Sequence, residues 1–500
     1  MLFNSYEFIF AFMPIAFFVY FYLNTKKLTL LAKAWLVLAS LFFYSWWNIS
    51  YLPLIVISIL VNYFISNLMI LRDQSRKYFF SNKRVLQIGL CFNIGLLAYF
   101  KYMDFFISNI NTVFGANIAA LNLALPLAIS FFTLQQIAFL VDSYEGLVKE
   151  NKFLTYALFV TFFPQLIAGP IVHHKDMMPQ FLNSRRKVKN YENILKGLFI
   201  FSIGLFKKVI LADTLAVWAT AGFDGATSLN FFAAWATSLA YTFQLYFDFS
   251  GYMDMAIGAA LLFNIRLPQN FNSPYKATGM IDYWSRWHIT LTTFITTYIY
   301  TPILRSFSKG PTFAKAMFVT IVAFLISGIW HGAQWIFIFW GLLHGLGVVI
   351  NHLWQKKVKI KMHKVLAWLI TFNYVNITFI FFRAKEWDDA FKVLSSMFSI
   401  NNIVLPAQLQ NKLFFLNNYG VEFGAWAEVI AGSNYTPIIL LLCFCLVLVP
   451  KNSIEIIHSK ELINKSTTSI YKAIFFGVLF ALSALYIYGS NYSEFVYFNF

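Results

Sequence analysis

Long runs of apolar residues alternate with short basic segments along almost the whole sequence. Runs of this kind occupy residues 8–23, 35–47, 52–71 and 198–220. A helix needs about 20 mostly apolar residues to span a bilayer, and on that length we expect about ten to thirteen spanning helices. The pattern therefore predicts an all-α fold, a polytopic transmembrane helical protein with a single membrane-embedded domain over residues 1–500.

The basic segments predict how the chain is oriented in the membrane. Lysine and arginine gather in residues 24–33, 72–84, 185–190 and 355–364, and are rare or absent in 109–117, 221–230 and 400–434. Short cytoplasmic loops carry the excess of basic residues. We therefore expect the first set of segments in the cytoplasm and the second set outside.

One apolar segment does not fit the number of crossings. Residues 153–170 are apolar, but basic residues flank them on both sides, so both ends should be cytoplasmic. Pro164, Gly169 and Pro170 interrupt the helical pattern. We expect a re-entrant element here, which at membrane depth must be buried in protein or line a cavity.

The composition agrees with a chain that lipid surrounds. Hydrophobic residues make up 59% of the sequence and charged residues 12%, against about 25% charged residues in soluble domains. The net charge of +17 arises mainly in the gaps between apolar runs, so we expect membrane lipid and no nucleic acid as a partner. Cys91, Cys443 and Cys445 lie inside apolar runs, and we expect neither a disulfide framework nor a metal.

His331 is the sharpest candidate for chemistry. It lies midway along a long apolar run, and ionisable groups at membrane depth are functional candidates. A lone buried histidine is more often a structural one, held by a hydrogen bond. Here Gly328 and Gly332 would leave room for a ligand, and Trp330 and Trp335 would give flat walls. We therefore predict that His331 is a general base.

A second histidine, His288, follows Arg286 and Trp287 in a segment rich in aromatic residues. It lies four residues after Trp284, so the two share a helix face. An interfacial belt of tryptophan and arginine would explain the neighbours of His288. It explains the histidine itself poorly, and we predict a functional role for His288.

Other ionisable residues have less specific patterns. Asp248 and Asp254 lie in a long apolar helix, where pairing with buried arginine or histidine is expected rather than proton transfer. Lys207 and Lys208 are expected to mark a helix end. The pair His173–His174 is expected in a solvated loop.

Several short motifs occur in a fixed order along the chain. They are Leu125-Pro-Leu-Ala-Ile-Ser-Phe131, Phe163-Pro-Gln-Leu-Ile-Ala-Gly-Pro170, Gly204-Leu-Phe-Lys-Lys208, Tyr246-Phe-Asp-Phe-Ser-Gly251, Trp287-His288, Trp330-His331-Gly332, Trp340-Gly341 and His344-Gly345. The ordered set resembles the membrane-bound O-acyltransferase (MBOAT) family, in particular its bacterial branch for alginate and peptidoglycan O-acetylation. The resemblance spans nearly the whole chain. One departure is Thr296-Thr297-Tyr298, where alginate-type relatives commonly carry Arg-Asp-Tyr, and it bears on which polysaccharide is modified.

The resemblance implies an O-acetyltransferase in the bacterial cytoplasmic (inner) membrane, with re-entrant elements around a central tunnel. His331 would be the central histidine, and His288 its partner on the cytoplasmic side, orienting the donor carbonyl. Acetyl-CoA would enter from the cytoplasm, and a periplasmic acetyltransferase partner would pass acetyl to an envelope polysaccharide. The residues expected to bind the donor are Arg286, Trp287, Trp330 and Trp335.

The aromatic segment 494–500 has two interpretations. Such a tail usually anchors a chain at the membrane. However, Phe495, Tyr497 and Phe500 are spaced as in the acyl-carrying motif of small proteins in the related D-alanylation systems, which this segment resembles. That resemblance implies Tyr497 as the acyl acceptor, with a partner residue as the alternative.

Three other functions remain open from the sequence. The first is transfer of D-alanine or another acyl group to a wall polymer. A lipid-linked-sugar transporter would show paired intramembrane charges and pseudo-symmetric halves. A non-catalytic scaffold would work without His331.

Overall fold

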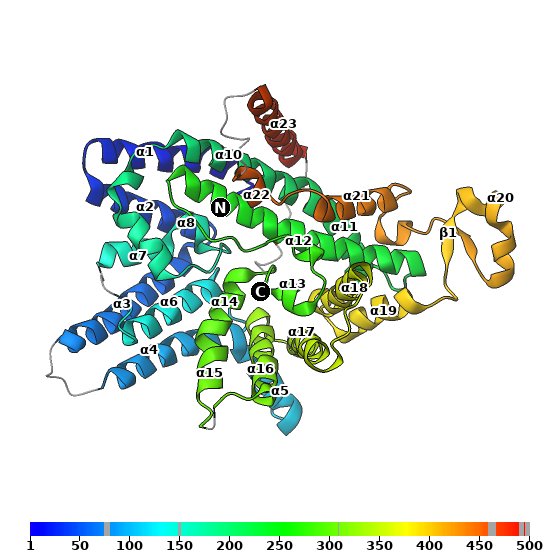
Figure 1. The fold of residues 1–500 in the computed structure, drawn as a ribbon, viewed down its shortest axis with the longest axis horizontal. Helices are drawn as coiled ribbons and strands as arrows, with labels where there is room; N and C mark the ends of the chain where they lie inside the picture. The colour runs from blue at the N-terminus through cyan, green and yellow to red at the C-terminus, as the bar shows by residue number, and fades with distance from the viewer. Residues whose placement is uncertain (75–80, 149–151, 309, 459–466, 490–494, 496–500) are drawn as a thin grey trace.

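The computed structural model describes residues 1–74, 81–148, 152–308, 310–458, 467–489 and 495 (Figure 1). Helices dominate this part of the chain. The strands in it, β1 (Val404–Pro406) and β2 (Glu422–Gly424), form a short parallel pair that joins Leu405 to Phe423. The predicted all-α fold is confirmed.

Seven helical segments of the described chain are long and apolar enough to cross a membrane. They are Glu7–Thr25, Ile49–Leu71, Asn82–Phe114, Phe313–His331, Trp335–Val358, Lys364–Arg383 and Ile470–Gly489. This number is below our expectation because some expected crossings are short, as in α2 (Thr29–Ser45) and α21 (Thr436–Leu448), or carry polar groups, as in α12 (Phe231–Leu262). The chain is a multi-pass membrane protein.

The first part of the chain forms the left half of the molecule in Figure 1, except for residues 103–114 at the bottom centre. Its helices are α1 (Met13–Thr25), α2, α3 (Leu52–Gln74), α4 (Asn82–Leu97), α5 (Met103–Phe114), α6 (Ile129–Tyr144), α7 (Phe153–Thr161), α8 (Phe163–Leu166) and α9 (His174–Leu182). The chain breaks at Phe162 between α7 and α8, then runs without helix from Ile167 to His173. This confirms the predicted interruption of the apolar segment, and its residues are buried in protein as membrane depth requires.

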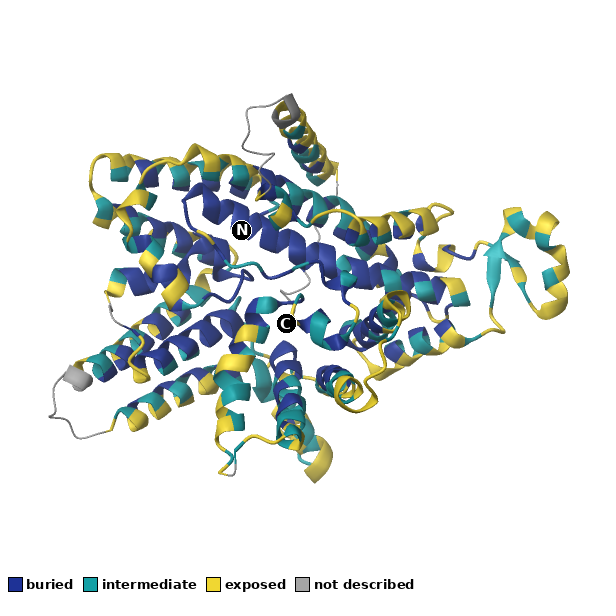
Figure 2. Cartoon of the chain, viewed as in Figure 1, coloured by how far each residue is buried: buried dark blue, intermediate teal, exposed yellow. Residues whose placement is uncertain are grey.

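Helix α12 is the buried centre of the fold, dark blue along most of its length in Figure 2. It packs along α10 (Tyr191–Phe206), which continues through the π-helical turn η5 (Lys207–Ala212) into α11 (Asp213–Thr220). Two glycine pairs bring the helices together. A Cβ on Gly197 would lie 2.8 Å from the carbonyl oxygen of Gly258, and one on Gly204 would lie 2.5 Å from that of Gly251. Because both pairs are seven residues apart on each helix, they recur on one face.

The charged residues of these helices form ion pairs across the same interface. Lys207 contacts Asp254 at 2.7 Å, and Lys208 contacts Asp248 at 2.9 Å. Lys208 also contacts Asp213 of its own helix at 2.8 Å. The expected pairing of the two aspartates is confirmed, although their partners are lysines rather than arginine or histidine. The expectation that the lysines mark a helix end is wrong, because α10, η5 and α11 form one continuous helix.

The remaining helices run from the bottom and centre of the molecule to its right half and upper edge in Figure 1. They are α13 (Met280–Trp284), α14 (Ile289–Ile295), α15 (Thr301–Arg305), α16 (Phe313–His331), α17 (Trp335–Leu353), α18 (Lys364–Arg383), α19 (Trp387–Phe398), α20 (Gln410–Leu413), α21, α22 (Ser453–Ile457) and α23 (Thr467–Gly489). Helices α16 and α17 form a hairpin, and α13 packs on α17. This arrangement brings the candidate histidines together.

Candidate functional site

The α16–α17 hairpin fixes the position of His331. Helix α16 ends at His331, and Gly332 is extended before α17 begins at Trp335. A Cβ on Gly328 would lie 2.3 Å from the carbonyl oxygen of Phe337, and one on Gly332 would lie 2.2 Å from its ring. Helix α17 therefore fills the space beside Gly328, and the expectation of room for a ligand is wrong there, whereas Gly332 also lines the cavity described below. Their role is to hold the hairpin closely together around His331.

Five rings lie in series through the protein core, and three of them are histidines. His288 and Trp330 have centroids 6.3 Å apart, Trp330 and His331 are 4.9 Å apart, and the ring of Trp340 lies 5.0 Å from that of His331. Trp340 is in turn 4.7 Å from His344. His288 and His331, which we predicted to act together, therefore lie on either side of the Trp330 ring in this series.

The local backbone and a single side chain orient His288. It lies between α13 and α14 in the left-handed region, with φ 45°, a conformation that is costly for non-glycine residues and common at functional sites. Its Nδ1 lies 3.2 Å from Oδ1 of Asn270, an oxygen that also accepts hydrogen bonds from the backbone N–H and the hydroxyl of Thr290. Because that oxygen can only accept, the bond places a proton on Nδ1 and leaves Nε2 as an acceptor.

Burial keeps this imidazole neutral. His288 lies outside the seven candidate spans, in the segment between α12 and α16. Burial lowers the pKa of His288 to about 3, because taking a charged group out of water disfavours the charged form. The ring is therefore an uncharged acceptor at neutral pH.

His344 belongs to the same ring series, although the sequence did not single it out for a catalytic role. It is fully buried on α17, and its Nε2 lies 2.8 Å from the hydroxyl of Thr378. The signal that could have found it is its position four residues after Trp340, which puts both on one helix face.

A cavity of about 680 Å³ reaches the neighbourhood of His331. Gly332 and Phe382 are among its lining residues, and the ring of Phe382 lies 5.2 Å from that of His331. Other lining residues come from segments that the sequence places outside the membrane or close to its outer face, among them Asp224 and Lys385. The cavity would therefore connect the histidine with the extracytoplasmic side.

The predicted donor-binding residues lie in different places. Trp330 lies within the ring series, and Trp287 is buried in an aromatic cluster in which its ring lies 4.9 Å from that of Phe271. Arg286 is partly exposed, and its Nε donates to Asp282 at 2.6 Å. Trp335 is 57% exposed and its Nε1 donates to Asn109. The structure therefore does not bring Trp335 to the other three.

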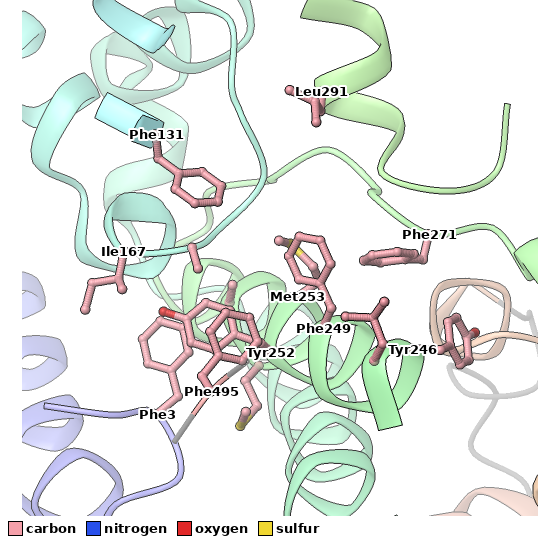
Figure 3. Close-up of a cluster of buried hydrophobic side chains, with 14 of the residues drawn as sticks. Phe3, Phe131, Ile167, Tyr246, Phe249, Tyr252, Met253, Phe271, Leu291 and Phe495 are labelled. Carbon is pink, nitrogen blue, oxygen red and sulfur yellow. The ribbon is translucent and has the colours of Figure 1, made fainter. Parts of the chain in front are cut away.

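The aromatic tail segment is described at one residue, while Tyr497 lies outside the described residues. Phe495 is 1% exposed, and its ring stacks on Tyr252 at 4.5 Å (Figure 3). It also lies 6.0 Å from Phe249, whose ring is 5.0 Å from His288. A residue of the tail thus lies in the protein core, one ring away from a candidate histidine.

The pair His173–His174 is not in a solvated loop, and that expectation is wrong. His173 Nε2 and His174 Nδ1 lie 2.7 and 3.0 Å from the same carboxylate oxygen of Asp142, which also contacts the hydroxyl of Tyr298. Asp142 and the two histidines could offer three metal ligands. However, Nδ1 of His173 accepts from the backbone N–H of Lys175, which places a proton on the Nε2 that faces Asp142. In this arrangement the cluster is a buried carboxylate that His173, His174 and Tyr298 surround.

The sequence matches a family model and several known proteins. Residues 8–385 match the model of the membrane-bound O-acyltransferase family. The chain is 47% identical to the peptidoglycan O-acetyltransferase of Helicobacter pylori, over 100% of this chain and 98% of that protein. It is 35% identical to the probable alginate O-acetylase of Azotobacter vinelandii, over 81% and 79%. It is 26% identical to the teichoic acid D-alanyltransferase of Streptococcus thermophilus, over 51% and 68%.

Proposed function

The chain belongs to the membrane-bound O-acyltransferase family and is an O-acyltransferase, and from this premise we propose that it moves acetyl from cytoplasmic acetyl-CoA to an extracytoplasmic acceptor. The final substrate would be peptidoglycan, since the relative with 47% identity over the whole chain acts on that polymer. The membrane would be the cytoplasmic membrane of a bacterium, and a periplasmic acetyltransferase would be the partner.

The observation that carries this proposal is the position of Trp330 between two histidines. One belongs to a segment predicted on the cytoplasmic side, and the other lies beside the cavity. His288 belongs to the segment between α12 and α16. Basic residues in that segment predict that it lies on the cytoplasmic side. Among them are Arg266, Lys276, Arg286 and Arg305. His331 lies beside the cavity whose lining includes segments predicted outside. A donor and an acceptor that enter from opposite sides would therefore meet at this ring series.

In the proposed reaction His331 acts as a general base. It takes the proton of the acceptor hydroxyl while the hydroxyl oxygen attacks the thioester carbonyl. The new ester C–O bond forms, the thioester C–S bond breaks, and the proton passes from the imidazole to the leaving thiolate. The rings of Trp330 and Trp340 pack against the imidazole and would limit the access of water to the thioester.

His288 would orient the donor through its Nε2. Since the Asn270 contact leaves that nitrogen as an acceptor, it would receive an N–H or O–H group of the donor rather than bind the thioester carbonyl. Arg286 is partly exposed and would pair with a donor phosphate, and Trp287 would support the wall behind. Trp335 is left out of the donor site, because it lies beside Asn109, in a segment predicted outside.

The acceptor hydroxyl would be that of Tyr497. Phe495 supports this assignment, since it lies in the core within one ring of His288. At up to about 3.5 Å per residue, two residues of chain span about 7 Å. The position of Phe495 therefore limits how far Tyr497 can be from the ring series. A phenyl acetate is an activated ester that can pass acetyl to a partner enzyme.

The transporter alternative predicted paired intramembrane charges, and the structure contains them in Lys207–Asp254 and Lys208–Asp248. These pairs hold α10 and η5 against α12 rather than line the cavity beside His331. Membership of an acyltransferase family favours the enzyme over the transporter.

The test in cells measures ester-linked acetate released by mild base from purified peptidoglycan. We expect His331→Gln to abolish it at unchanged protein level, and His288→Ala to reduce it less completely. His458→Gln, at an exposed histidine, is the matched control and should retain the wild-type level. Wild-type acetylation in His331→Gln would rule out the catalytic assignment. If the peptidoglycan of the wild type carries no acetate and another wall polymer carries D-alanine or a different acyl group, the alternative acyl transfer is favoured.

A further inference from the structure

Two neighbouring side chains of another helix hold the carbonyl groups at the end of α16. The Lys101 ammonium donates to the carbonyl oxygens of Trp330 at 2.5 Å and His331 at 3.3 Å. The Tyr102 hydroxyl donates to the carbonyl oxygen of Ile329 at 2.9 Å. The last carbonyls of a helix have no partner within the helix. Here three successive carbonyls, those of residues 329–331, accept hydrogen bonds from Lys101 and Tyr102.

The backbone of the donor helix explains why adjacent residues can do this. Lys101 and Tyr102 end the π-helical turn η3 (Ala98–Tyr102), which joins α4 to α5. A π-turn inserts an extra residue into a helix and shifts the side chains that follow, and such turns are frequent at functional sites. The turn therefore places two long polar side chains where a regular helix would direct them differently.

The hydrogen bonds of Lys101 define its role. Besides the carbonyl oxygens of Trp330 and His331, its ammonium contacts the Ser130 hydroxyl at 3.3 Å. An ammonium has three N–H donors, so these three acceptors use them all. Lys101 also lies 5.8 Å from the centre of the Trp330 ring, where a cation is attracted to the ring face. Lys101 also lines the cavity beside His331, but its three donors already bind the end of α16 and Ser130.

We propose that Lys101 and Tyr102 are positioning residues that fix the end of α16 and thereby the imidazole of His331. The inference rests on the proposed catalytic role of His331. Two sets of contacts therefore hold the end of α16, the Lys101–Tyr102 hydrogen bonds to its carbonyls and the close packing of Gly328 and Gly332 on Phe337 of α17.

The test measures steady-state CoA release from acetyl-CoA by the purified protein in lipid vesicles. Peptidoglycan and the proposed periplasmic acetyltransferase are supplied, so that the acetylated tail can turn over. We expect Lys101→Met to lower kcat roughly 10- to 100-fold, because a displacement of about 1 Å of a catalytic group costs up to about 100-fold. KM for acetyl-CoA should change less than about twofold, since a positioning residue does not touch the donor. Lys101→Arg should restore part of the rate, and Tyr102→Phe should show a smaller loss of kcat.

Matched controls lie on the same helix. Lys83→Met removes an exposed lysine of α4, and Tyr99→Phe removes the hydroxyl of a 46% exposed tyrosine in the same turn. Both should keep the wild-type kcat. If Lys101→Met does not fold, the kcat values of the conservative variants Lys101→Arg and Tyr102→Phe test the inference instead. Wild-type kcat in Lys101→Met or in both conservative variants, or a loss confined to KM, would overturn the inference. Inactive wild-type protein would instead contradict the proposed function itself.

Discussion

The ring of Phe495 stacks on the ring of Tyr252, with centroids 4.5 Å and planes 26° apart. Tyr252 belongs to α12, the buried centre of the fold, so a residue of the aromatic tail is part of the core. A tail that served only as a membrane anchor would not need this contact. The contact favours a tail that works inside the protein.

The first prediction concerns the tail hydroxyl. Tyr497→Phe keeps an aromatic ring and removes only the nucleophile, so acetyl on the tail peptide should disappear and peptidoglycan acetylation should be lost. Mass spectrometry of the C-terminal peptide after incubation with acetyl-CoA measures the first effect. Tyr488→Phe, at an 87% exposed tyrosine, should behave as wild type. Undiminished polymer acetylation in Tyr497→Phe would place the acceptor on a partner protein.

The second prediction concerns the pH dependence of stability. Burial lowers the pKa of His288 to about 3 in the folded protein, against about 6.5 unfolded. Between these values the unfolded state binds a proton that the folded state does not, so stability falls as the pH falls through that window. The melting temperature of His288→Gln should therefore depend less steeply on pH between about 6.5 and 4. Equal slopes for the variant and the wild type would contradict the buried neutral imidazole.

The third prediction concerns the ion pair of Lys207 and Asp254. Asp254 also accepts a hydrogen bond from Ser453 at 2.5 Å. Removing one partner leaves a buried charge, so Asp254→Asn should destabilise the protein by about 3–5 kcal/mol. The double change Lys207→Met with Asp254→Leu should recover much of that loss, measured by thermal unfolding in detergent.

Activity per folded molecule separates this structural role from proton transfer. The double variant should release CoA at close to the wild-type rate, since neither residue lies in the ring series. A folded double variant without activity would mean that the pair takes part in the reaction.

The fourth prediction concerns orientation in the membrane. In a background without native cysteines, a cysteine at Val358 should resist an impermeant thiol reagent in intact cells, and one at Thr227 should react. Both positions are exposed, so access to the reagent depends on the side of the membrane. Strong labelling at Val358 in intact cells would reverse the predicted orientation.

The sequence predicted the helical membrane fold and the two histidines because those signals are local. Apolar runs and isolated ionisable residues are visible at the position where they occur. Contacts with residues that are distant in the sequence are not visible in this way. Lys101 and Trp330 are 229 positions apart, and no pattern near either residue indicates the contact.

Tertiary structure also explains why the predictions for Trp335 and for the His173–His174 pair differ from the structure. Trp330 and Trp335 are five residues apart, but the break at Gly332 leaves one in the ring series and the other exposed. The same limit applied to His173 and His174, since their partner Asp142 lies on another helix. Burial of these side chains depended on tertiary packing that sequence spacing does not encode.

The most direct test of the acyl-transfer account is CoA release by the purified protein in lipid vesicles that contain radiolabelled acetyl-CoA. The wild type should release CoA and carry label on its own chain. His331→Gln, equally folded, should do neither, while His458→Gln should match the wild type. CoA release by His331→Gln at the wild-type rate would contradict the account, because no other group proposed here can take the proton of the acceptor.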